Sequence, residues 1–124
     1  MSNQLSVYPN TVTTLMSHRV VDKTISVEMG HLNVIIGEHL HTLTSGMNVT
    51  IPKNTLFAYA NLSPSPTVIT ERIEHPTFAK DLVVHAEVNG IVYDANPAPA
   101  MQSSLSLYRS LVDMLIATPE KMSA

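Results

Sequence analysis

Hydrophobic and polar residues alternate in short segments across residues 20–72, and turn residues separate each segment from the next. The segments are about six residues long and rich in Val, Ile, Thr and Tyr, which is typical of β-strands. Gly30, Gly37, Gly46, Pro52 and Pro64 lie between them. Short, evenly spaced strands predict a sandwich or barrel and argue against alternating βαβ units. The predicted strands are Thr24–Met29, His31–Ile36, Glu38–Leu43, Met47–Ile51, Leu56–Ala60 and Thr67–Arg72.

The next stretch, residues 76–95, allows two interpretations. Asn89-Gly90 between two apolar runs is typical of a two-residue β-hairpin. The same pair also suits the end of a helix running from Pro76 through Ala86. We expect a short helix over Pro76–Leu82, followed by strands over Val83–Val88 and Ile91–Tyr93.

After Pro97 and Pro99 the hydrophobic residues recur at helical spacing and no longer alternate. The final segment therefore predicts an amphipathic helix over residues 103–118. Ser103 or Ser104 is placed to cap its start and Pro119 to end it. Leu107, Leu111, Met114 and Leu115 fall at helical spacing. Apolar residues also lie off this stripe, so a second face is available for a partner. We expect a homodimer formed through this helix or through a barrel edge; the proposed dimerisation residues are Leu105, Tyr108, Leu111, Val112 and Leu115.

A chain of 124 residues with 44% hydrophobic positions fits one domain with its own core. We divide it into an N-terminal arm or edge strand at 1–15, a barrel at 16–96 and the helix. A net charge of −3 and 14% charged residues argue against direct contact with nucleic acid. The sequence contains no cysteine, no apolar run long enough to cross a bilayer, and no signal-peptide pattern at its start. We therefore expect a cytoplasmic protein without membrane contact.

The segment from Gly46 to Asn61 resembles the second conserved motif of the cupin superfamily, whose fold is a jelly-roll barrel. Gly46, Pro52 and Asn61 match this motif in register. Asn54 stands where the motif has a second glycine, and asparagine tolerates positive φ better than most residues. Phe57 stands where the motif has a metal-binding histidine. The resemblance predicts a mainly β, cupin-like double-stranded β-helix followed by the terminal helix.

The first cupin motif is more weakly matched. When it is anchored on Gly30, Met16 and His18 fall at its two histidine positions and Lys23 falls at its glutamate position. A cupin metal centre needs several N or O donors on one cavity wall. A lysine ammonium repels a divalent cation, and Phe57 donates nothing. We therefore predict no metal and no other cofactor at this site.

Other polar residues suggest weaker candidates. His39 and His41 share one face of a predicted strand and could bind a metal, but two half-exposed histidines on a polar face are more common. Glu71, near Glu74 and His75, would suit acid–base chemistry, although we expect these residues to be solvated. His31 and His85 fit no pattern and are expected at the surface.

The barrel interior is the expected binding site. Alternation along the strand turns Phe57 and Tyr59 into the cavity. An aromatic interior would enclose a small apolar or amphipathic molecule, although the same side chains could simply fill a small barrel. The proposed ligand-binding residues are Met16, His18, Val34, Ile36, Phe57 and Tyr59.

A polar arm, a barrel without metal ligands and a terminal helix are similar to the sensor domain of AraC-type transcription regulators. That resemblance implies a non-catalytic domain that binds a small-molecule effector and dimerises. The alternative is a free-standing metal-dependent cupin enzyme, such as a dioxygenase or isomerase. A third option, a metal-free epimerase-like cupin, would need a His–Asp pair facing a tyrosine: His18 with Asp22 or Asp94, and Tyr59.

Overall fold

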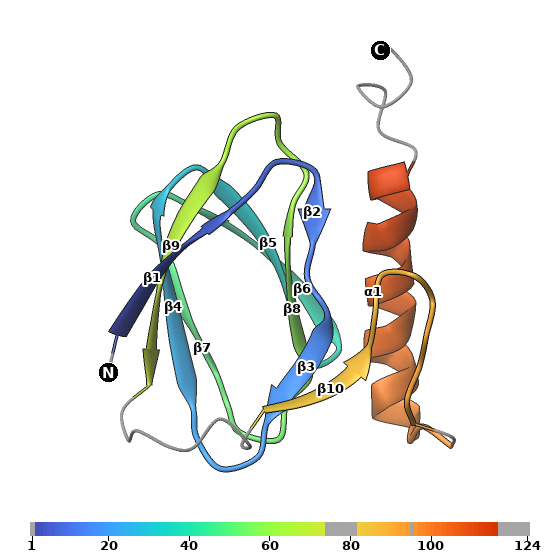
Figure 1. Cartoon of the computed structure of the whole chain (residues 1–124). Helices are drawn as coiled ribbons and strands as arrows, with labels where there is room; N and C mark the ends of the chain where they lie inside the picture. The colour runs from blue at the N-terminus through green and yellow to red at the C-terminus, as the bar shows by residue number, and fades with distance from the viewer. Residues whose placement is uncertain (1, 74–81, 95, 117–124) are drawn as a thin grey trace.

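Two antiparallel β-sheets face each other, and one α-helix packs on the outside of the second sheet (Figure 1). The computed structural model describes residues 2–73, 82–94 and 96–116. The strands are β1 Ser2–Val7, β2 Thr11–Val12, β3 Leu15–His18, β4 Lys23–Met29, β5 His31–Ile36, β6 His39–Thr44, β7 Asn48–Ile51, β8 Phe57–Asn61, β9 Thr67–Ile73 and β10 Leu82–Ala86, and the helix is α1 Pro99–Ile116.

Neighbouring strands in each sheet are mostly distant in sequence. The first sheet has the order β1-β9-β4-β7, and the second has β10-β3-β8-β5-β6, with β2 pairing β8. Each sheet thus inserts a late strand, β9 or β8, between two early ones. The expected mainly β barrel with a C-terminal helix is confirmed; β1 is an edge strand of the first sheet, and β2 pairs with β8 in the second.

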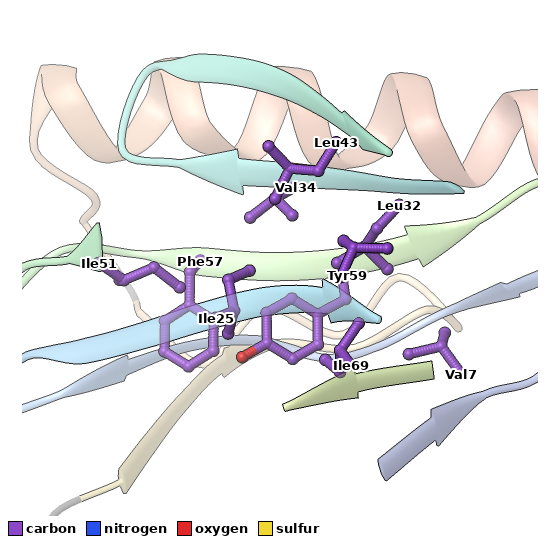
Figure 2. Close-up of a cluster of buried hydrophobic side chains, with 10 residues drawn as sticks. Val7, Ile25, Leu32, Val34, Leu43, Ile51, Phe57, Tyr59 and Ile69 are labelled. Carbon is purple, nitrogen blue, oxygen red and sulfur yellow. The ribbon is translucent and has the colours of Figure 1, made fainter. Parts of the chain in front are cut away.

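Alternate residues of both sheets fill the space between them (Figure 2). Along β4, Ile25 and Val27 point inward while Thr24 and Ser26 are half-buried on the other side. This period of two places one side chain from every second position in a shared core. The core consists of Val7, Ile25, Val27, Leu32, Val34, Leu43, Ile51, Phe57, Tyr59 and Ile69.

The helix α1 forms a second core on the outer face of the β2–β8–β5 region. All five residues of β8 are buried because the interior covers one face of this strand and α1 covers the other. Ala58 and Ala60, which face the helix, are small enough to let it approach closely. The second core consists of Val12, Leu15, Ile35, Ala58, Ala60, Ala86, Leu105, Tyr108, Leu111 and Leu115.

Two hydrogen bonds join the buried face of α1 to the barrel. The Tyr108 hydroxyl donates to the Thr13 carbonyl at 2.6 Å, and the Ser104 hydroxyl donates to the Gly37 carbonyl. On this face Leu105 is buried with Leu111 and Leu115, whereas Met114 is 53% exposed. Of the predicted stripe, Leu111 and Leu115 are buried and Leu107 is half-buried, but Met114 is exposed, so the buried face of the helix is rotated toward Leu105 and Tyr108.

The helix also begins earlier than predicted, at Pro99. The Gln102 amide donates to the Ala98 carbonyl at 2.9 Å, so Pro99 occupies the first helical position, where its missing N–H costs nothing. Ser103 and Ser104 lie inside the helix and do not cap it.

The six predicted strands between residues 24 and 72 are each found within one residue at either end. The Asn89-Gly90 hairpin is also present, but its loop has three residues: the Gly90 amide donates to the Glu87 carbonyl and the Glu87 amide donates to the Ile91 carbonyl. Gly90 has a φ of 97°, which suits the last position of such a loop. The predicted helix over Pro76–Leu82 lies outside the described residues except for Leu82, which begins β10.

Replacing Leu111 with alanine tests the helix packing. We expect Leu111→Ala to lower the free energy of unfolding by about 2–5 kcal/mol, because it leaves a cavity in the second core. Met114→Ala, three residues along on the exposed side, is the matched control and is expected to change it by about 0.5 kcal/mol or less. Urea denaturation measures both. An equal loss in the two variants would contradict the orientation of α1.

Candidate functional site

Polar side chains from three strands meet inside the otherwise apolar barrel. Lys23 begins β4 and points inward with Ile25, and Glu71 of β9 lies directly opposite Ile25. The Lys23 ammonium donates to Glu71 Oε2 at 3.0 Å. The Tyr59 hydroxyl, from β8 in the opposite sheet, donates to the same oxygen at 2.6 Å. We call this arrangement the Lys23–Glu71–Tyr59 network.

Phe57 is the aromatic centre of this region. Lys23 Nζ lies 4.8 Å from the centroid of the Phe57 ring, within the range of a cation–π contact. The His18 ring stacks on the Phe57 ring at 5.6 Å with an angle of 9° between the planes. Tyr59 is also 5.6 Å away, tilted by 39°. Phe57 thus contacts a cation, an imidazole and a phenol.

Burial makes the ion pair significant for the electrostatics of the interior. The Lys23 side chain is 8% exposed and that of Glu71 is 17% exposed. Burial, followed by the negative charge of Glu71 and the hydrogen bond to it, raises the pKa of Tyr59 well above its usual value of 10.0. Tyr59 is therefore a neutral donor near neutral pH. The prediction that Glu71 is solvated was wrong, since its side chain is largely buried and bonded to Lys23 and Tyr59. The sequence did not reveal these partners because they are remote from Glu71 along the chain.

The residues at the cupin metal positions do not suit a divalent cation. Met16 and His18 on β3 flank the interior, Phe57 is fully buried, and Lys23 brings its own positive charge to Glu71. Among the described residues, no group of three or more His, Cys, Asp or Glu is placed to hold a metal ion.

The predicted ligand-binding residues do converge on the barrel interior. Val34, Phe57 and Tyr59 belong to its core, with Met16 and Ile36 packed against them and His18 stacked on Phe57. They pack against one another, and neither of the two hollows described next is lined by them. Ligand binding in the interior remains a prediction.

The larger hollow lies between the β10 hairpin and α1 and has a volume of about 280 Å³. Its apolar wall includes Ala86, Val92, Leu105 and Val112, while Glu87, Arg109 and Asp113 supply charge. Tyr108 lines it too; burial, and then the charge of Glu87, raise its pKa to about 12. Sequence reasoning missed this hollow, although the apolar residues off the predicted helix stripe pointed to it. A smaller hollow of about 230 Å³ lies at the start of α1, beside Gly37 and Asn54.

The predicted dimerisation residues are used within the chain. Leu105, Tyr108, Leu111 and Leu115 are buried against the barrel, and Val112 is half-buried beside them. Dimerisation remains a prediction, and in this structure the exposed part of α1 includes Met114 instead.

The predicted surface position of His85 and the predicted pairing of His18 with Asp22 or Asp94 both need correction. His85 is not a surface residue: its side chain is 15% exposed and its Nδ1 lies 2.9 Å from Asp94 Oδ2. Asp94 therefore pairs with His85 and not with His18, and Asp22 accepts from the Lys53 amide at 2.8 Å. Tyr59 bonds Glu71, so the His–Asp–Tyr arrangement of an epimerase-like site is not formed with these partners. His41 is half-buried and His39 exposed, as expected.

The sequence matches no protein-family model, and no curated protein matches it significantly. Similar folds do occur among solved structures. A dTDP sugar isomerase from Desulfovibrio desulfuricans is 15% identical with a TM-score of 0.62, covering 70% of this chain and 64% of that chain. The Cupin_2 domain of an XRE family transcriptional regulator from Enterobacter cloacae is 22% identical with a TM-score of 0.54, covering 61% and 81%.

A de novo designed double-stranded β-helix is 17% identical with a TM-score of 0.52, covering 60% of this chain and 99% of the design. The present chain covers less than two thirds of the length of the dTDP sugar isomerase. At these identities the likeness establishes the fold alone, which is a cupin-like double-stranded β-helix with a C-terminal helix. No described helix has the length and apolarity needed to span a membrane.

A double-mutant cycle tests the buried ion pair. We expect Lys23→Met and Glu71→Gln each to lower the free energy of unfolding by about 3 kcal/mol, because each leaves the other partner buried and uncompensated. The double variant should lose less than the sum. Lys53→Met, at an exposed lysine, is the control and is expected to change stability by about 0.5 kcal/mol or less. Strict additivity would mean that the two charges are not coupled.

The raised pKa of Tyr59 predicts a loss of stability at high pH. The unfolded chain releases the Tyr59 proton near pH 10, whereas the folded chain retains it. The contribution is therefore complete below pH 10 and falls above it, by up to about 1.4 kcal/mol per pH unit. We expect Tyr59→Phe to reduce this slope and Tyr8→Phe, at an exposed tyrosine, to leave it unchanged; denaturation between pH 8 and pH 11 measures it. Identical slopes in wild type and Tyr59→Phe would refute this assignment.

Proposed function

We propose that this chain is a metal-independent cupin domain that binds a small organic effector and self-associates, as a regulatory module does. The observation that carries the proposal is the Lys23–Glu71 ion pair, which neutralises the interior charge without a metal ion. A cation already bonded to the one carboxylate of the network leaves that carboxylate poorly suited as a metal ligand. The domain would then act through binding.

The hollow between the β10 hairpin and α1 is the better candidate for the effector site. Its volume of about 280 Å³ is close to the lower end of the range for small-molecule sites. Leu105 and Val112 favour an apolar body on the ligand, and Arg109 and Asp113 favour a polar group at the rim. The effector is therefore a compact amphipathic molecule.

A chain of hydrogen bonds connects this hollow to the barrel. Tyr108, in its wall, donates to the Thr13 carbonyl at 2.6 Å. The Thr13 amide donates to the Tyr59 carbonyl at 2.9 Å, and the Thr13 hydroxyl accepts from the Tyr59 amide at 2.9 Å. An effector with different affinities for two positions of α1 would shift their populations. Such a shift would alter the surface that α1 presents to a second copy.

The structural neighbours are compatible with both classes of function. One is a domain of a transcriptional regulator, which supports the regulatory role, and one is a sugar isomerase, which supports an enzyme. The fold therefore does not decide between them. The residues at the metal positions favour the regulator over a metal-dependent enzyme, and an AraC-type role remains the more specific form of this proposal.

Metal analysis combined with thermal shift tests the proposal. We expect protein incubated with iron, manganese, nickel or zinc and then dialysed to retain only traces of metal. A screen of compact amphipathic molecules should raise the melting temperature; at about 100 times its Kd, a ligand contributes about 2.7 kcal/mol. Sedimentation measured with and without that ligand should show self-association. A stoichiometric metal content that enhances stability would favour the enzyme instead.

A pair of tryptophan variants locates the effector site. Val112→Trp fills the hollow and should abolish the thermal shift, whereas Met114→Trp, on the exposed side of the same helix, should leave it intact. If the ligand still raised the melting temperature of Val112→Trp, the effector site would be assigned to the barrel interior instead.

A further inference from the structure

Ser17, His85 and Asp94 form a hydrogen-bonded series outside the barrel interior. His85 Nε2 lies 2.8 Å from Ser17 Oγ, and His85 Nδ1 lies 2.9 Å from Asp94 Oδ2. Ser17 alternates along β3 with Met16 and His18, which belong to the interior side, so it lies on the outer face. The proposed function uses none of these three residues.

A β-bulge brings His85 to Ser17. Val84 pairs with Met16 and Ala86 pairs with Leu15, so His85 is an extra residue between two regular pairs. Such bulges redirect a side chain and are common beside active sites. The strand β10 lies at the edge of its sheet, where the redirected ring does not disturb a further strand.

The hairpin then returns the chain to place Asp94. The Tyr93 amide donates to the His85 carbonyl at 2.9 Å, and Ala86 forms a bridge with Val92. These contacts hold Asp94 beside the imidazole of His85. Three residues from two distant parts of the sequence are therefore positioned by backbone pairing.

The order of the three groups determines the direction of each hydrogen bond. The Asp94 carboxylate only accepts, so His85 Nδ1 carries the proton and donates it. In the tautomer with its proton on Nδ1, Nε2 is the acceptor and the Ser17 hydroxyl donates to it. This is the tautomer that a histidine needs in order to remove the serine proton, with a carboxylate that orients the ring.

The exposed fraction increases from Ser17 through His85 to Asp94. Ser17 is 6% exposed, the His85 side chain is 15% exposed and that of Asp94 is 38% exposed. The hydroxyl and the imidazole thus meet in a partly desolvated place, while Asp94 contacts solvent. Limited access to Ser17 favours a small acyl group.

We propose that Ser17, His85 and Asp94 are a metal-independent acyl-transfer site that hydrolyses small esters with good leaving groups. Ser17 Oγ forms a bond to the carbonyl carbon as its proton passes to His85 Nε2. The ester C–O bond breaks, and the leaving oxygen takes the proton from Nε2. Water, deprotonated by the same nitrogen, then releases the acid and restores Ser17. Esters with good leaving groups require the least stabilisation of the transition state.

Covalent labelling of the full chain tests the nucleophile. A fluorophosphonate probe should form a P–O bond to Ser17 with loss of fluoride, and peptide mapping by mass spectrometry identifies the labelled residue. Hydrolysis of p-nitrophenyl acetate is followed in parallel. We expect Ser17→Ala to abolish both labelling and the enzymatic part of hydrolysis, and Asp94→Asn to lower hydrolysis by about a hundredfold or more.

Two controls separate this role from a structural one. Ser106→Ala removes an exposed serine of α1 and should change neither readout. Asp94→Asn alters a half-buried side chain and keeps its shape, so it is informative even if Ser17→Ala does not fold; its melting temperature and circular dichroism should match the wild type. Absence of labelling, labelling at another residue, or hydrolysis unchanged in Asp94→Asn overturns the proposal, and none of these results bears on effector binding at α1.

Discussion

The interior of this barrel depends on the pairing of Lys23 with Glu71. Taking either charge out of water alone would cost several kcal/mol, so each makes the burial of the other tolerable. The Tyr59 hydroxyl donates to the same carboxylate oxygen, and Phe57 lies under the ammonium. A cupin-like barrel commonly offers this space to a metal ion. Here a side chain provides the positive charge, and the surrounding aromatic rings close the space.

The strand β8 lies between the interior network and the helix and contacts both. Phe57 and Tyr59 face the interior, while Ala58 and Ala60 face α1. Thr13 pairs with the Tyr59 backbone and accepts from Tyr108 of the helix. A displacement of α1 would therefore act, through Thr13, on the backbone of Tyr59, whose hydroxyl bonds the buried carboxylate. This gives the outer hollow and the inner network a physical connection across one strand.

Local patterns in the sequence were sufficient to predict most of the fold. Alternation revealed the strands because burial of one face requires a period of two. Asn54 has a φ of 61°, as its place in the glycine position of the motif predicted. The rotation of α1 was missed because apolar residues occupy more than one of its faces, and the bonds from Ser104 and Tyr108 end on carbonyls that are remote in sequence.

The candidate sites were less predictable, because their partners meet only through strand pairing. Lys23 was noticed as a misfit at a metal position, but Glu71 lies 48 residues away and looked solvated. His85 fits no motif, since a bulge is a property of two paired strands and leaves no mark in one of them.

A common fold with a sugar isomerase and a regulatory domain leaves function to the side chains. In this chain the interior and the outer face have separate chemistry. In the network around Lys23, the ammonium and the Tyr59 hydroxyl both donate to one oxygen of Glu71. Ser17 and His85 instead have their polar atoms directed toward each other near a sheet edge, with an ionisable carboxylate behind them. The interior network and the Ser17 hydroxyl can therefore have separate roles, because the two sites share β3 but use its opposite faces.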